Sequence, residues 1–397
     1  MKTITVIGGG FSGLTLARAL LKEGAKVVLI EKENRCGGLI RTRRLASGLA
    51  ESAASSISRT ARVDRLLEEL RLPALVPDKA SNRKLFYVGR PRRWPLGVFE
   101  TLHVVWKYVA GKVKRRLPPL PGESVSAWGG RCLTKPATEK LLAAGLQGIY
   151  AGDIDHMSAS LVLGPMFRRD RGRYLGLVGL QGGMGVLIEA LKKDILARGG
   201  EIRESVEISG DNLPTPCALA VPAPEAARLL RAQAPALAER ISRIRYAPLV
   251  AANLFFEEDN GQRAFGCLVP RGQGLRTLGV LFHRCIFPTQ DRLSCERWIL
   301  GGATDPAAAD LSAEGLRELI RTERRRILGL DDQPVESEIA VWKQGLPHYD
   351  LTLEKILEDL PEPEGIWLHG NWLGGIGLSR ILERSESLAK KIVRESA

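Results

Sequence analysis

The 397-residue sequence has no apolar run of about 18 residues, so no segment is expected to cross a lipid bilayer. The N-terminus lacks a basic region and a cleavage site, which argues against a signal peptide. The six cysteines form no C-x-x-C pair, and the five histidines show no metal-ligand spacing. These absences argue against a disulfide scaffold and a metal site, and they suit a reducing cytosol.

The sequence also lacks a Ser/His/Asp set or paired carboxylates that would mark a catalytic centre, and no catalytic side chain is assigned. The formal net charge is +13. Such a surface suits anionic substrates, anionic lipid or nucleic acid, and a solvated basic surface without a partner is the alternative. No nucleic-acid-binding motif accompanies the charge, so nucleic acid is not expected as a partner.

The stretch at residues 3–13 reads T-I-T-V-I-G-G-G-F-S-G, an apolar strand followed by glycines and the start of a helix. Gly8, Gly10 and Gly13 have the G-x-G-x-x-G spacing, which allows a tight turn, close approach to a pyrophosphate and close helix packing. A second strand at 26–30 ends in Glu31, 18 residues after Gly13, where a ribose-binding carboxylate belongs. An ordinary glycine turn is the alternative, but strand, helix, strand and acid together favour a dinucleotide site.

The length predicts two or three domains. Helices are expected at 62–70, 184–198, 225–237, 313–328 and 379–393. Strand-like runs at 244–256, 264–270, 278–282, 287–291 and 299–302 predict a sheet, which is either purely structural or the wall of a substrate site. A second strand, glycine loop and helix near the C-terminus, around Gly374–Gly377, repeats the pattern of the first.

Residues 89–120 combine aromatic and aliphatic side chains with basic clusters at 90–93 and 112–116. An apolar helix with such borders suits a position in a membrane interface. The alternative is a buried helix in a helical subdomain whose charges are solvated.

After Glu31 the chain reads Arg35-Cys36-Gly37-Gly38, and its first 60 residues resemble the flavin-binding family of amine oxidases, carotenoid desaturases and protoporphyrinogen oxidases. Later stretches resemble the protoporphyrinogen oxidases in order: N-R-K-L-F-Y-V-G at 82–89, G-I-Y-A-G-D at 148–153 and W-K-Q-G-L-P-H-Y at 342–349. The resemblance spans nearly the whole chain.

The resemblance implies an α/β fold with a Rossmann-like FAD-binding domain of the amine oxidase type, a β-sheet substrate domain and a small helical subdomain. The FAD-binding domain would be discontinuous, with residues 1–76, 174–222 and 350–397. The substrate domain would comprise 77–90 and 223–349. Residues 91–173 would form the helical, membrane-associating subdomain.

The resemblance also implies a function: FAD-dependent oxidation of a porphyrinogen, with protoporphyrinogen IX favoured, at CH–CH bonds, with O2 as acceptor and H2O2 as product. Coproporphyrinogen III, an amine or a carotenoid as substrate, and a non-catalytic flavin- or porphyrin-binding homologue, remain alternatives. A peripheral position on the inner, cytoplasmic face of the cell membrane is expected, and a homodimer is left open.

The resemblance assigns site residues one by one. Arg83 would pair with a propionate, Phe265, Leu268 and Ile299 would line an apolar slot for the macrocycle, and Gly152 and Gly266 would leave room for it. The residues expected at FAD are Gly8, Gly9, Gly10, Phe11, Ser12, Gly13, Glu31, Arg35, Gly37, Gly38, Leu39, Val206, Asn371, Ile376, Gly377 and Leu378.

The chain departs from the family pattern at several of these places. Ala53-Ala54 stands where members usually carry Gly-Pro, and Ser55 where some carry an arginine that could bind a propionate. Leu39 stands where tryptophan is common, and Asn371-Trp372 replaces a smaller pair. FAD binding is still expected with these changes. What they put in question is the identity of the substrate and the catalytic turnover.

Overall fold

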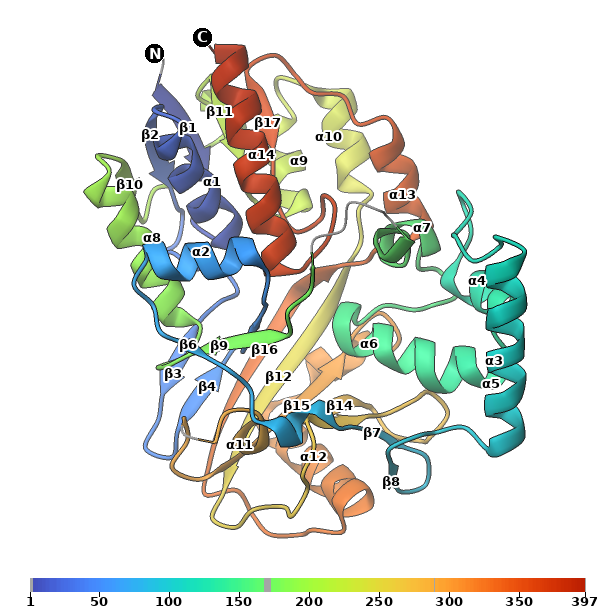
Figure 1. Ribbon diagram of the computed structural model, residues 1–397. Coiled ribbons are helices and arrows are strands. Elements are labelled where there is room, and N and C mark those ends of the chain that lie inside the picture. The colour runs from blue at the N-terminus through green and yellow to red at the C-terminus, as the bar shows by residue number, and fades with distance from the viewer. Residues whose placement is uncertain (1–2, 168–172, 289, 397) are drawn as a thin grey trace.

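The computed structural model describes residues 3–167, 173–288 and 290–396 (Figure 1). It shows two sheets stacked end to end, with helices packed on the first sheet and a helical layer on the side of the second. The N- and C-termini lie close together beside the first sheet.

The first sheet is a five-stranded parallel sheet with the order β10 (Glu201–Arg203), β2 (Lys26–Ile30), β1 (Thr3–Ile7), β11 (Cys217–Leu219) and β17 (Ile366–Leu368). Its strands are short and apolar because both faces are covered by helices. Ile4, Val6 and Leu29 are buried under α1 (Phe11–Lys22), α8 (Gly185–Ala197), α14 (Leu378–Ser396) and α2 (Ala61–Glu69). Ile7 and Leu219 are buried on the opposite face.

Helices α9 (Ala223–Leu230), α10 (Pro235–Ser242) and α13 (Leu351–Glu358) cover that opposite face. Helices were expected over 225–237, and the chain forms two there, which are separated just before Pro235. Proline lacks an N–H and starts a new helix more easily than it continues one. Residues 223–242 thus share a core with the first sheet, although the sequence places them with the substrate domain.

The second sheet has seven strands in the order β16 (Glu336–Pro347), β12 (Tyr246–Phe256), β15 (Ser294–Gly301), β14 (Thr277–Phe282), β13 (Gly266–Leu268), β7 (Lys84–Tyr87) and β8 (Pro91–Arg92). Only the β13–β7 pair is parallel. Val250, Leu254 and Trp298 on one face are buried beneath α12 (Ala313–Leu328). The other face is turned toward the first sheet and the helical layer.

The run at 287–291 is not a strand. Residues His283–Ile286 form the short helix α11, Phe287 follows it, and position 289 lies outside the described residues.

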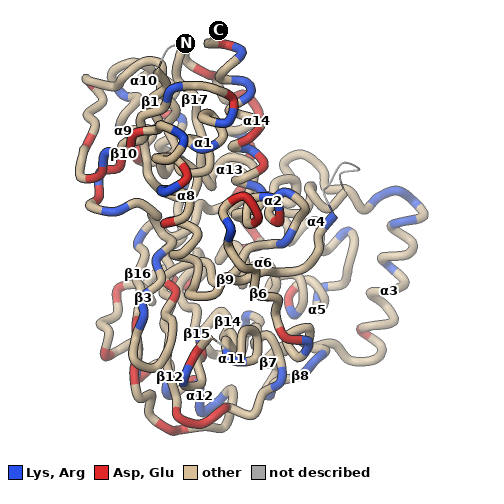
Figure 2. Tube along the Cα trace, turned by 60° about the vertical axis from the view of Figure 1, so that its left-hand side comes forward, with Lys and Arg blue, Asp and Glu red and all other residues tan. Residues whose placement is uncertain are grey.

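The helical layer consists of α3 (Val98–Val113), α4 (Val125–Cys132), α5 (Lys135–Ala137), η2 (Thr138–Ala143), α6 (Ala144–Tyr150) and α7 (Ala159–Val162). Helix α3 is its outermost member (Figures 1 and 2). Two small sheets, β3 (Thr42–Arg44) with β4 (Leu49–Glu51) and β5 (Ile57–Ser58) with β9 (Leu177–Leu180) and β6 (Ala74–Leu75), join the layers. The described residues also form short 3-10 helices: η1 (Lys79–Asn82), η3 (Gly164–Phe167), η4 (Gly210–Asn212) and η5 (Pro306–Asp310).

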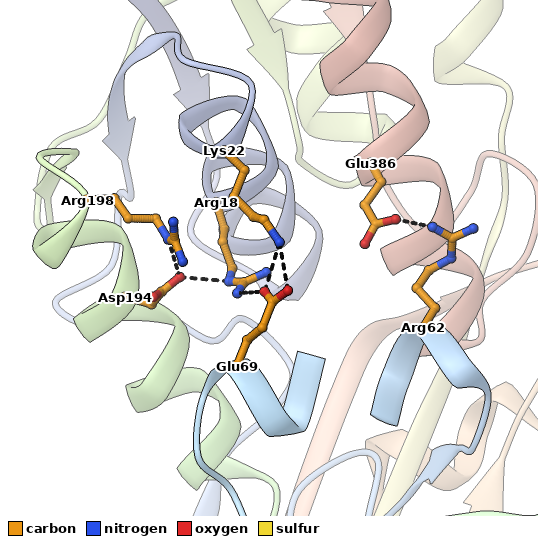
Figure 3. Close-up of polar contacts among 7 residues, drawn as sticks. All are labelled: Arg18, Lys22, Arg62, Glu69, Asp194, Arg198 and Glu386. Carbon is orange, nitrogen blue, oxygen red and sulfur yellow. Dashed lines mark hydrogen bonds and ion pairs between the residues drawn. The ribbon is translucent and has the colours of Figure 1, made fainter. Parts of the chain in front are cut away.

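A buried ion network ties the helices around the first sheet (Figure 3). Arg18 of α1 bonds Asp194 of α8 at 2.8 Å and Glu69 of α2 at 2.5 Å. Burial alone would raise the pKa of Glu69, but hydrogen bonds from Lys22 and Arg18 outweigh it and lower the pKa to about 2. A second pair, Arg62 with Glu386, connects α2 to α14. The network fixes the position of α1 relative to α2 and α8.

Replacing Arg18 with methionine should lower the free energy of unfolding by about 2 kcal/mol, because Glu69 and Asp194 lose a buried partner. Lys22→Met is the matched control, since Lys22 contacts the same Glu69 from a more exposed position and should cost less than about 1 kcal/mol. Urea unfolding of both variants measures the difference. Equal losses would contradict the structural role given to Arg18.

Candidate functional site

The turn between β1 and α1 has the geometry that a pyrophosphate needs. Gly8 has φ +105°, and a Cβ on Gly13 would lie 1.8 Å from the Gly8 carbonyl oxygen. The first N–H bonded inside the helix is that of Leu14, which donates to Gly10 O at 3.0 Å. The N–H groups of Phe11, Ser12 and Gly13 therefore have no acceptor among the described residues and lie at the positive end of the helix dipole.

The buried carboxylate of Glu31 lies beside this turn. Its Oε2 accepts from Gly9 N at 2.6 Å and its Oε1 from Glu33 N at 2.9 Å. Each oxygen keeps a lone pair for a ribose hydroxyl. Val206 lies next to it, because its N–H donates to Glu31 O at 3.0 Å, and the Val206 side chain is exposed.

The Gly37–Gly38 loop lies directly on the first glycine turn. Gly37 N donates to Gly9 O at 2.8 Å, and a Cβ on Gly38 would lie 3.3 Å from Gly10 Cα. Arg35 stabilises this loop by donating to the carbonyls of Cys36 (3.1 Å) and Gly38 (3.0 Å). Burial and the neighbouring Arg41 lower the pKa of Arg35. Leu39, at the end of the loop, is half-buried.

The second glycine loop follows β17 and is held by Tyr349. The Tyr349 hydroxyl donates to Asn371 O at 2.6 Å and accepts from Gly375 N at 2.7 Å. Burial raises the pKa of this hydroxyl, so it stays protonated. Trp372 is fully buried, and its Nε1 donates to Val221 O at 3.1 Å.

Helix α14 begins directly after this loop, at Leu378. The first N–H groups with an acceptor inside the helix are those of Arg380 and Ile381, which donate to Gly377 O. The N–H groups of Leu378 and Ser379 have no acceptor in the described part of the chain, as at the start of α1. Ile376, Gly377 and Leu378 therefore lie at a second helix N-terminus that can face a ligand.

Three buried polar residues that sequence reasoning missed join the two glycine loops. Thr15 of α1 and Ser385 of α14 have hydroxyl oxygens 2.8 Å apart, and His369 Nε2 lies 2.9 Å from Ser385 Oγ. Burial and the nearby Arg384 lower the pKa of His369 to about 3, so its ring is neutral. No spacing in the sequence marks these residues, because they come from segments more than 350 positions apart.

Two of the expected substrate residues, Leu268 and Ile299, lie on the face of the second sheet that α12 does not cover. Arg83 O accepts from Phe265 N at 2.7 Å, so the two are adjacent in space, and the Arg83 side chain is exposed. In the register of the sheet, Leu268 of β13 lies opposite Gly279 of β14, and Gly279 lies opposite Ile299 of β15. Ile299 is the one residue of β15 that is not buried, so its side chain faces open space.

The two glycines expected to leave room for a substrate do not do so. A Cβ on Gly152 would lie 2.5 Å from Met157 Sδ, and one on Gly266 would lie 2.2 Å from Val280 O. Protein atoms already fill both spaces. Gly152 and Gly266 are glycines because the neighbouring chain packs against them, and this corrects the role taken from the resemblance.

Two cavities of about 560 Å³ and 540 Å³ lie between the helical layer and the β13–β14 hairpin, and both are lined by Arg271 and Gly272. The first also contains Gln147, Asp153 and Thr277. None of the expected substrate residues lines either cavity.

Another unexpected group brings His283, Asp291 and Cys295 together, with ligand-type atoms within 4.8 Å of one another. Both Asp291 oxygens are engaged, one by His283 Nδ1 at 2.7 Å and the other by Leu49 N at 2.8 Å. Hydrogen bonding inside the core accounts for this arrangement.

Comparison with known proteins identifies the family. The model for flavin containing amine oxidoreductases matches residues 11–210, half of the chain. The chain belongs to this family. Spinach chloroplastic protoporphyrinogen oxidase 1 is 25% identical over 98% of this chain and 83% of its own length.

Two solved structures share the fold of this oxidoreductase. A candidate protoporphyrinogen oxidase from Exiguobacterium has a TM-score of 0.79 at 20% identity, over 99% of both chains. Cyclohexylamine oxidase from Brevibacterium oxydans has a TM-score of 0.75 at 14% identity, also over 99% of both chains. At these identities the likeness concerns the fold.

FAD is the cofactor of this oxidoreductase, and the residues present fit it. The free N–H groups of α1 suit the pyrophosphate, the Glu31 carboxylate suits a ribose, and the Gly37–Gly38 and Gly374–Gly377 loops add glycine backbone beside the two helix N-termini.

The neutral His369 predicts a pH dependence of stability. Its pKa is about 3 in the folded chain and lies near the ordinary 6.5 when unfolded. Between these values only the unfolded chain binds the proton, so stability falls as the pH drops through this window, by up to about 1.4 kcal/mol per unit. His369→Asn should flatten the slope of unfolding free energy between pH 6 and pH 4, whereas His103→Asn on exposed α3 should keep it. An unchanged slope in His369→Asn would count against this explanation.

Proposed function

We propose that this FAD-dependent oxidoreductase oxidises a porphyrinogen, with protoporphyrinogen IX favoured, to the porphyrin, using O2 and releasing H2O2. The observation that carries the proposal is an apolar sheet face with a cation at its edge. Leu268 and Ile299 stand on two strands separated only by Gly279, and Arg83 immediately precedes β7 and lies next to Phe265. Several relatives are named protoporphyrinogen oxidases, including the spinach protein.

The shape of this face suits a flat ring. Gly279 places only backbone between Leu268 and Ile299, so the two side chains can contact one face of a macrocycle. Gly148 of α6 lies above Leu268, since a Cβ there would be 2.7 Å from Leu268 Cδ2. Helix α6 therefore packs on Leu268 and would bound the slot at that end of the sheet face.

The charge of Arg83 suits the acidic arms of a porphyrinogen. The guanidinium is exposed and forms no ion pair within the described part of the chain. Guanidinium and carboxylate pair bidentately, so Arg83 would orient the substrate through a propionate.

The bound FAD supplies the chemistry by accepting a hydride from a methylene bridge of the substrate. The chain's own residues bind and orient. The N-termini of α1 and α14 hold the cofactor from two sides, the apolar sheet face excludes water, and Arg83 holds the acidic edge of the ring.

The reaction is tested by adding protoporphyrinogen IX or coproporphyrinogen III to the purified protein in air and following porphyrin fluorescence. Fluorescence should rise faster than autoxidation and stoichiometric H2O2 should form. A rate equal to autoxidation for both substrates would refute the proposal, and a preference for coproporphyrinogen III would change the substrate within the same class.

Arg83→Gln should raise KM for the porphyrinogen about tenfold, equivalent to about 1.4 kcal/mol, with kcat changed less, because the propionate contact binds ground state and transition state alike. Lys84→Gln, the adjacent exposed cation, is the control and should leave KM unchanged. Steady-state fluorescence rates give both constants. Equal KM values in the two variants would remove Arg83 from the site.

Amine oxidation is the second candidate, favoured by the fold shared with cyclohexylamine oxidase. Anaerobic addition of cyclohexylamine or a carotenoid should leave the flavin oxidised if the porphyrinogen proposal holds. Flavin bleaching by either would support that alternative, and a flavoprotein inert to all substrates would support a non-catalytic homologue.

We also propose that α3 rests on the inner, cytoplasmic face of an anionic cell membrane. None of its residues is buried, and Phe99 is 87% and Trp106 67% exposed. Its polar side faces the protein, since Lys107 Nζ donates to Gly130 O and Glu100 pairs with Lys140. The other large exposed apolar residues of α3 are Val98, Leu102, Val105, Tyr108, Val109 and Val113.

Basic residues lie at both ends of α3 (Figure 2). Arg92 and Arg93 precede it, Lys112 lies in its last turn and Lys114 to Arg116 follow, all exposed and without an acid partner among the described residues. Anionic headgroups would complement these charges while the apolar side enters the interface. No helix in the described part of the chain is long and apolar enough to span a bilayer.

The double variant Phe99→Ser, Trp106→Ser should lose most of its co-sedimentation with vesicles containing phosphatidylserine, because the inserted apolar area is removed. Val335→Ser, an exposed apolar residue far from α3, is the control. Wild-type binding should weaken with salt and with neutral phosphatidylcholine vesicles. Unchanged binding of the double variant would contradict the proposal.

A further inference from the structure

The larger of the two cavities beside Arg271 is bounded by three separate parts of the chain. Its volume is about 560 Å³, and none of the expected substrate residues lines it. Helix α6 and the residues after it form one wall with Gln147 and Asp153. The loop between β13 and β14 forms a second wall, and residues 303–305 after β15 form the third. Ligand sites commonly lie in clefts of this volume between structural units.

Two buried side chains that line this cavity have polar atoms without a partner. Gln147 is 6% and Thr277 2% exposed. The Gln147 Nε2 donates to Thr304 Oγ1 at 3.4 Å, which leaves the Gln147 Oε1 as an acceptor. Neither Gln147 Oε1 nor Thr277 Oγ1 has a hydrogen-bond partner among the described residues. One water molecule would fill only a small part of the volume in front of them, so the cavity has room for a larger polar molecule.

The charges around the cavity balance one another. Arg271 Nη2 lies 2.8 Å from Asp153 Oδ1. Arg276 donates to Asp305 through Nε at 2.7 Å and through Nη2 at 2.8 Å. No further Lys, Arg, Asp or Glu of the described residues lines the cavity. A bare anion would therefore be repelled by the acids, and a bare cation by the arginines.

The rest of the lining restricts the class of ligand further. No aromatic side chain in the described part of the chain lines the cavity, so a flat ring would find no stacking partner there. A metal ion would have to compete with the guanidinium groups for the carboxylates. The apolar lining residues Val269, Leu275 and Leu278 suit a short hydrocarbon chain. The cavity thus complements a small molecule with one charge of each sign and a short apolar part.

We propose that this cavity binds a small zwitterion, in which an ammonium group and a carboxylate are joined by a short hydrocarbon chain. The carboxylate would lie between Arg271 and Arg276 and accept from the Thr277 hydroxyl. The ammonium would donate to Gln147 Oε1 and face the Asp153 carboxylate. Such a ligand would connect the helical layer to the second sheet, because its two ends contact residues of both.

The test is isothermal titration calorimetry of the FAD-loaded full chain with glycine, 3-aminopropionate and 4-aminobutyrate. These three molecules carry the same two charged groups at increasing separation. At least one of them should bind with a Kd below about 1 mM. Propionate and propylamine keep only one charge each, and glycerol has none, so all three should bind at least about tenfold more weakly.

Thr277→Val removes the hydroxyl while keeping the shape of the side chain, and it should weaken binding of the tightest zwitterion about tenfold. Thr352→Val, on an exposed position of α13 outside the cavity, is the matched control and should equal the wild type. Without ligand, Thr277→Val should have a Tm no lower than that of the wild type, because the lost hydroxyl is unpaired. A purely structural role for this hydroxyl predicts a lower Tm.

Gln147→Met provides a second variant in case Thr277→Val does not fold, since it removes the amide acceptor at similar volume and should also weaken binding about tenfold. The proposal is overturned if no zwitterion of the three binds with a Kd below about 1 mM, in which case water alone fills the cavity. It is also overturned if propionate, propylamine or glycerol binds as tightly as the best zwitterion, or if the variant measured binds like the wild type. These outcomes do not depend on porphyrinogen turnover, which is measured separately by fluorescence.

Discussion

Every part of the cofactor site depends on the close approach of α1 to the end of β1. A Cβ on Gly13 would overlap the Gly8 carbonyl oxygen, and one on Gly8 would lie 2.6 Å from Ala220 O. With glycine at both positions the helix starts close to the sheet, and its free N–H groups face the space above the strand ends. The Gly37–Gly38 loop then packs directly on this turn. Helix α14 is joined to α1 through Thr15. The two halves of the nucleotide site are thus joined through α1.

The second sheet carries the proposed substrate face and also the side chains that bind the backbone of residues 51–53. Its buried face packs under α12 and gives it rigidity. Its other face carries apolar residues such as Ile299 beside polar residues such as Asn253 and Arg297. The polar residues do not face solvent, because they bind the backbone that crosses from β4 toward β5. One face can therefore hold the backbone of residues 51–53 and offer a slot to a flat apolar ring.

Helix α3 has the opposite orientation to that of an ordinary surface helix, because its large apolar side chains are exposed. A surface helix normally buries its apolar side. Here Glu100 and Lys107 face the protein and bond to Lys140 and Gly130, while Phe99 and Trp106 face outward. The arrangement leaves a large apolar surface that no described part of the chain covers, between two basic borders, and this suits a membrane surface better than water.

The sequence by itself determined the parts that rest on local rules. The G-x-G-x-x-G turn, the acid after β2, the second glycine loop and the main helices and strands follow from backbone freedom and periodicity over a few residues. Only the tertiary structure decided that Gly152 and Gly266 are filled by Met157 and Val280, that 223–242 packs on the first sheet, and that three strands bind three consecutive carbonyls. The physical reason is that packing and hydrogen bonding join residues hundreds of positions apart. No spacing in the sequence records which glycine faces a neighbour and which faces a ligand.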